Sequence, residues 1–148
     1  MKLCFLKCEI LKCLGVEDSG NTNADFEGTI VKYTNKIFSE FAERNKNNKN
    51  VILYANANGI QSLSDESLAD CVYFLNLLSF VVQGSNTSNN CVNYAFVNRN
   101  ESVKNALYLV SVIRKLGKNL FASAEQICKC EYDTIVSVMY CIISIAHK

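Results

Sequence analysis

The stretch from Leu68 to Val82 constrains the fold of this chain more than any other segment. Apolar residues recur along it at helical spacing: Leu68, Val72, Leu75, Leu78, Val81 and Val82. The other faces of the same helix are also mainly apolar, with Cys71, Tyr73, Phe74, Leu77 and Phe80. A helix that is apolar all round has to be covered by other elements. We therefore predict a central, buried helix that ends before Gly84.

The remaining periodic segments predict an all-α fold. Further helices are expected over Leu3 to Leu14, from about Thr22 to Arg44, from Val103 to Gly117 and from Ile135 to Ala146. Ser62 to Glu66 carries a start signal for the central helix, and short connecting helices or turns are expected at Val92 to Val97 and Ser123 to Gln126. The run from Val51 to Tyr54 favours a strand by composition, and its structure stays open. We divide the chain into an N-terminal helix and linker, residues 1–20, and a helical domain of about four main helices, residues 21–148.

Composition indicates a single globular domain and excludes several classes of partner. The chain has 148 residues, 49% of them apolar, with 15 basic and 14 acidic side chains. A formal net charge of +1 gives no overall field toward nucleic acid or an anionic membrane. The apolar stretches are too short or too interrupted to span a bilayer. No export signal precedes them, so we expect a cytoplasmic protein without nucleic-acid or membrane partners.

The residues that usually carry catalysis or bind metals are sparse. Eight cysteines occur without a Cys-x-x-Cys pair, and the single histidine is His147. Cys128 and Cys130 form a Cys-x-Cys pair, which is a weak signal for redox or metal chemistry. A redox or metal-binding helical protein is therefore the last of three functional hypotheses, after the two given at the end of this subsection. No glycine-rich phosphate loop or EF-hand spacing is present. We expect no enzymatic activity, no cofactor and no metal.

The distribution of charge provides the main functional signal. No lysine or arginine occurs from Asn50 through Asn98, whereas the segment from Arg99 to Lys118 has five basic residues against Glu101 alone. These candidate protein-binding residues are Arg99, Lys104, Arg114, Lys115 and Lys118. Such a segment can meet an acidic protein surface. The alternative interpretation is an ordinary solvated helix face.

Several segments together resemble a known family. The runs NALYLVSVIRKLG, LFASAEQI and IVSVMYCIIS, at 105–117, 120–127 and 135–144, resemble the C-terminal half of a calponin-homology domain, most closely the last such domain of the fimbrin type. Similar pieces lie upstream in the same order: CEILKCLG at 8–15, IVKYTNKIF at 30–38, SLSDESLADCVYFLNLLS at 62–79 and VNYAFV at 92–97. The chain departs from the family where Tyr33 replaces a tryptophan, and where Ala124 and Gln126 replace a proline and an aspartate.

The resemblance implies a function in the actin cytoskeleton. Calponin-homology domains of this type work in pairs, so it implies a module that binds and crosslinks actin filaments together with a preceding domain. Arg114 and Lys115 match family positions that bind the filament or pack against another domain. The alternative is a helical adaptor that has lost actin binding and captures another protein through Leu3 to Leu14.

Overall fold

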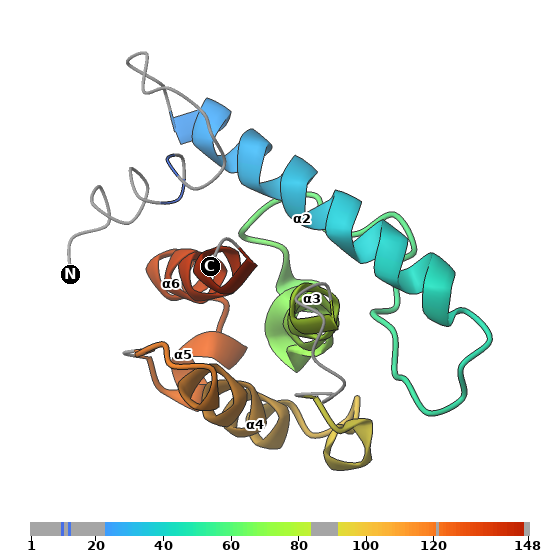
Figure 1. The fold of residues 1–148 in the computed structure, drawn as a ribbon. Helices are drawn as coiled ribbons and strands as arrows, with labels where there is room; N and C mark the ends of the chain where they lie inside the picture. Colours follow the sequence, from blue (N-terminus) through green and yellow to red (C-terminus); the bar gives the residue numbers. More distant parts are fainter. Residues whose placement is uncertain (1–9, 11, 13–22, 84–91, 121, 147–148) are drawn as a thin grey trace.

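A computed structural model describes residue 10, residue 12 and residues 23–83, 92–120 and 122–146. Within these ranges the chain forms helices and loops and contains no strand, which confirms the all-α prediction. The elements, in order, are α2 (Asn23–Asn45), η1 (Glu66–Asp70), α3 (Val72–Gln83), η2 (Tyr94–Phe96), α4 (Ser102–Lys115), α5 (Ala124–Cys128) and α6 (Tyr132–Ala146). Figure 1 shows α3 in the middle, with α2 on one side and α4, α5 and α6 on the other.

Helix α3 is the buried central helix that the sequence predicts. Every residue from Val72 to Ser79 is buried. The helix packs against α2 and α6, which supply much of its cover. Burial of so many large apolar side chains is the main favourable contribution to folding, at about 25 cal/mol for each Å² removed from water. The predicted centre of the core is therefore confirmed.

The start of the central helix differs from the prediction. The segment that begins at Glu66 is a short 3-10 helix, and Cys71 then takes a left-handed backbone conformation with φ of 62°. Two aspartates explain the break, because each one caps its own helix. Asp65 accepts a hydrogen bond from the Ser67 N–H, and Asp70 accepts one from the Val72 N–H. Helix α3 begins after that second cap.

Other predicted elements are found close to their expected positions. Helix α2 has 23 residues and buries Ile30, Phe38 and Phe41. The run from Val51 to Tyr54 is irregular and forms no strand. Helix α5 begins with the predicted cap, in which Ser123 and Gln126 bond reciprocally to each other's backbone. No helix in the described ranges is long and apolar enough to cross a membrane.

The predicted N-terminal helix and linker lie almost entirely outside the described residues. Two positions are described: Ile10, which is helical and fully buried, and Lys12, which is exposed. Ile10 belongs to the same apolar core as α3 and α6. At least one apolar residue of the predicted N-terminal helix is thus covered by the chain itself.

Candidate protein-binding surface

The five predicted binding residues divide into two groups. Lys104, Arg114 and Lys115 are exposed on α4. Arg99 lies in the loop before α4, and Lys118 lies just after its end. Helix α4 thus brings three of the five cations together on its solvent side.

Arg99 and Lys118 interact with the body of the domain. The Arg99 guanidinium donates a hydrogen bond to the Leu53 carbonyl oxygen. Burial raises the pKa of the Asp70 carboxyl, while the Val72 N–H and the Arg99 charge oppose that rise. Lys118 is only partly exposed and acts on the buried Cys141 thiol. We therefore leave both cations out of the candidate surface.

Three large apolar side chains lie exposed beside the α4 cations. Phe96, Val103 and Leu107 have exposed fractions of 65%, 48% and 58%. The apolar spacing that predicts this helix includes Val103 and Leu107, but the structure exposes both side chains. The buried side of α4 carries a neighbouring set instead: Asn105, Ala106, Leu109, Val110, Val112 and Ile113.

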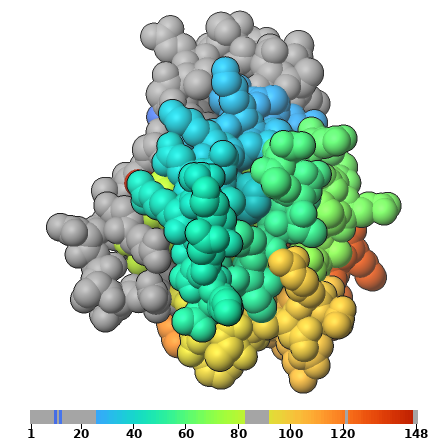
Figure 2. Space-filling view, turned by 90° about the vertical axis from the view of Figure 1, so that its right-hand side faces the viewer, coloured from blue at the N-terminus to red at the C-terminus, as the bar shows by residue number. Residues whose placement is uncertain are grey.

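We call the exposed cations and large apolar side chains of α4, together with Phe96 of η2, the α4 face. It consists of Phe96, Val103, Lys104, Leu107, Arg114 and Lys115. The helical repeat places Val103 and Leu107 one turn apart, with Arg114 further along the same side. Figure 2 shows the residues of η2 and the start of α4, coloured yellow to light orange, projecting at the lower edge of the molecule.

Element η2 is held against α4 by aromatic and polar contacts. The rings of Phe96 and Tyr108 lie with their centroids 5.7 Å apart. The Tyr108 hydroxyl accepts a hydrogen bond of 2.6 Å from the Asn93 N–H. Asn93 in turn caps η2 by accepting from the Ala95 N–H. These contacts fix the position of η2 relative to Tyr108 of α4.

Asn105 anchors the start of α4 to the rest of the domain. Its side chain is fully buried, and its Nδ2 donates to the carbonyl oxygens of Asn98 and Asp70 at 2.7 and 3.0 Å. Its Oδ1 accepts from the Asn98 N–H at 3.0 Å. A buried amide with its bonding capacity filled specifies one arrangement, because leaving either partner unbonded costs about 1 to 3 kcal/mol. The surface is therefore organised before any partner arrives.

The Lys104 ammonium forms a weak, exposed ion pair with Glu101. Its Nζ lies 3.1 Å from the Glu101 carboxylate, and both side chains are substantially exposed. Ion pairs of this kind contribute about 0 to 1 kcal/mol and exchange easily with other partners. Lys104 remains able to meet a carboxylate of a bound protein.

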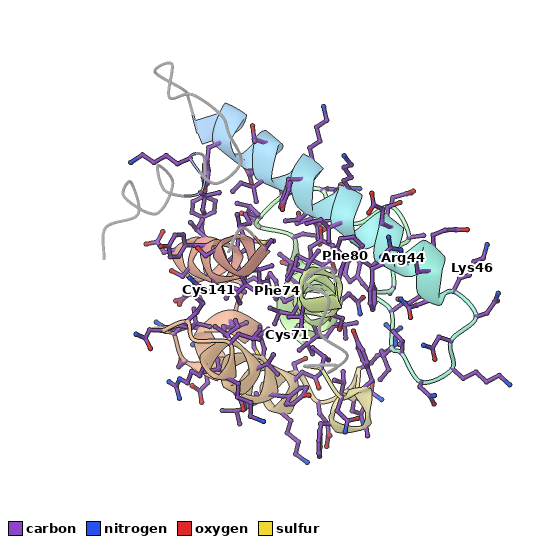
Figure 3. All side chains as sticks on the ribbon, in the orientation of Figure 1. Arg44, Lys46, Cys71, Phe74, Phe80 and Cys141 are labelled. Atoms are coloured by element: carbon purple, nitrogen blue, oxygen red, sulfur yellow. The ribbon has the colours of Figure 1, made fainter. Side chains whose placement is uncertain are left out.

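The described cysteines are poorly suited to nucleophilic chemistry. Burial raises the pKa of the thiols of Cys71, Cys128 and Cys130, and neighbouring acidic groups raise it further. Burial also raises the pKa of Cys141 to about 11. Cys71 and Cys141 lie in the interior among the helices (Figure 3). Within the described ranges, no group of three or more potential metal ligands is present.

A shallow pocket lies between the loop that follows α2 and the start of η1. Its volume is about 420 Å³, and it is lined by Tyr54, Ala55, Asn56, Gln61, Ser62, Asp65 and Ser67. Ser67 donates a hydrogen bond of 2.6 Å to Asp65 and also contacts the Tyr54 hydroxyl. Activation of a serine requires a base positioned to take its proton. The described residues contain no histidine to fill that role.

No protein-family model and no curated protein matches this chain. The α4 face is therefore interpreted from its own residues and their geometry.

Proposed function

We propose that this chain is a calponin-homology domain of the fimbrin type that binds actin filaments through the α4 face, as one part of a tandem or multi-chain assembly. The observation that carries the proposal is the cluster of exposed cations on α4, which are Lys104, Arg114 and Lys115. The all-helical fold around one buried helix and the ordered series of family-like segments support it.

Electrostatic complementarity gives the α4 face its selectivity. The filament is an acidic surface, and the only acidic residue between Arg99 and Lys118 is Glu101. Because the cations are exposed, they act mainly on the rate of encounter and on the choice of partner. Screening over about 10 Å at 0.1 M salt makes such binding sensitive to ionic strength.

A second candidate function is a helical adaptor that binds a protein other than actin. The exposed side chains of Phe96 and Leu107 favour this alternative, because aromatic and aliphatic residues concentrate at the centre of protein interfaces. The sequence predicts Leu3 to Leu14 as the binding element of such an adaptor. Ile10 of that segment is already buried in the core, so the α4 face is the better candidate for this function too.

Cosedimentation with actin filaments tests the first proposal. The chain should pellet with filaments at low salt and less at physiological salt. Arg114→Glu and Lys115→Glu should each weaken binding about tenfold, or about 1.4 kcal/mol. Lys36→Glu, which reverses an exposed charge on α2, is the matched control and should leave binding unchanged.

Two results would count against actin as the partner. One is a failure to pellet even when a preceding calponin-homology domain is joined to the chain. The other is equal weakening by Lys36→Glu and Lys115→Glu, because binding would then follow net charge and not the α4 face.

A further inference from the structure

We infer that the α4 face receives an acidic amphipathic α-helix of the partner, packed across Val103 and Leu107. The inference rests on the proposed function for the location of the partner site. It adds the kind of structural element that the partner presents there.

The first argument is the concentration of exposed apolar side chains at one place. Among the described residues, the large hydrophobic side chains that are exposed are Phe96, Val103 and Leu107, and all three belong to η2 or α4. Single exposed apolar residues are normal, but Val103 and Leu107 lie one turn apart on α4, and neighbouring exposed apolar side chains mark a contact surface. An occupant of the α4 face therefore has to supply apolar side chains of its own.

The second argument is the charge around this apolar centre. Lys104, Arg114 and Lys115 lie on the same exposed side of α4 as the two aliphatic residues. The occupant therefore needs carboxylates beside its apolar side chains. A basic or purely apolar segment would place no carboxylate beside Arg114 and Lys115.

The third argument concerns the shape of the occupant. Val103 and Leu107 form a ridge on a helix, four residues apart. A ridge of this spacing fits the groove between side-chain rows of a second helix, at interaxial distances of about 8 to 10 Å. Addition of an extended strand requires an open sheet edge, and the described part of the chain contains no strand. A helix with acidic residues flanking its apolar stripe meets all three conditions.

The fourth argument is that the surface is already rigid. The Asn105 side chain fixes the loop before α4, and the Tyr108 hydroxyl fixes the backbone at Asn93. Ordering a side chain at an interface costs about 0.5 to 1.5 kcal/mol, so a fixed surface retains more of its contact energy.

A synthetic peptide provides the test. The probe is a helical peptide with leucine at every third or fourth position and glutamate on both flanks, labelled for fluorescence anisotropy with the full chain. We expect micromolar binding by the wild-type protein and at least tenfold weaker binding by Leu107→Ser. A peptide of the same composition in scrambled order is the matched control and should not bind.

The outcomes separate this inference from the proposed function. Peptide binding that is abolished by Leu107→Ser supports the inference, even if the chain does not pellet with actin filaments. In that case only the choice of actin as the partner is wrong. Filament pelleting that Leu107→Ser leaves unchanged, without peptide binding, overturns the inference and keeps actin. Equal binding of the scrambled and amphipathic peptides also overturns it. Thermal unfolding followed by circular dichroism checks that Leu107→Ser remains folded.

Discussion

Two asparagine side chains hold the long loop between α2 and η1 in place of regular backbone pairing. Asn35 Nδ2 donates to the Ile60 carbonyl at 2.8 Å, and its Oδ1 accepts from the Ile60 N–H at 3.0 Å. Asn76 holds an earlier part of the same loop in the same way. Its Nδ2 donates to the Ile52 carbonyl oxygen, and its Oδ1 accepts from the Tyr54 N–H. Side-chain amides thus satisfy backbone groups that would otherwise be buried without partners.

Gly59 is the residue that lets the loop approach Asn35. Its φ is +84°, and an added Cβ would overlap the Asn35 side chain. Gly59→Ala should therefore lower the free energy of unfolding by about 2 kcal/mol. Gly28 is exposed within α2, and a Cβ added there would meet open space. Gly28→Ala should therefore raise the free energy of unfolding by about 0.5 to 1 kcal/mol. Urea denaturation measures both, and equal stability of the two variants would contradict this account.

The buried thiols allow a second prediction at this scale. With its pKa raised to about 11, Cys141 is ionised in about one molecule in a thousand at pH 8, since each unit below the pKa lowers the thiolate fraction tenfold. In the native protein, iodoacetamide should therefore label Cys141 far more slowly than the half-exposed Cys128. Raising the pH toward 11 should speed its labelling. Peptide mass spectrometry reads each site, and fast labelling of Cys141 at pH 8 would show that α6 opens readily.

At the scale of elements, the sequence predicts the helices better than their faces. The central helix is visible because apolar residues occupy nearly all of its positions. Its first turn is not predictable, because the choice between one helix and two depends on the caps of Asp65 and Asp70. On α4, the pairs Val103–Leu107 and Ala106–Val110 both have helical spacing, and only tertiary packing decides that the second pair is buried. The sequence therefore reveals the cations of the α4 face and misses its apolar centre.

The same leucine-to-aspartate substitution, made once in α3 and once in α4, distinguishes a buried position from an exposed one. Leu75 on α3 is fully buried, so Leu75→Asp places a charge in the core and should unfold the domain at a cost of several kcal/mol. Leu107→Asp makes the same change on the α4 face, where water solvates the carboxylate. It should alter the free energy of unfolding by no more than about 1 kcal/mol. Circular dichroism in urea compares them, and a folded Leu75→Asp variant would refute the placement of α3.

At the scale of the whole molecule, the net charge is only +1, and charged groups of both signs gather on neighbouring elements. Asp65, Glu66 and Asp70 all act on the Cys130 thiol and so lie together around η1, which packs against α4. The cations of the α4 face form the one surface proposed here for an acidic partner. One such face gives one attachment point, and crosslinking requires two.

If the proposed function is correct, the isolated chain should bind actin filaments without bundling them. It should pellet with filaments at high speed and leave them in the supernatant at low speed, where only bundles sediment. Two copies joined by a flexible linker should bundle, because the second attachment becomes intramolecular at an effective concentration near millimolar. The same tandem carrying Lys115→Glu in both copies is the control and should bundle less. Low-speed pelleting by the unlinked chain would reveal a second filament site or self-association, and the single-face interpretation would then be wrong.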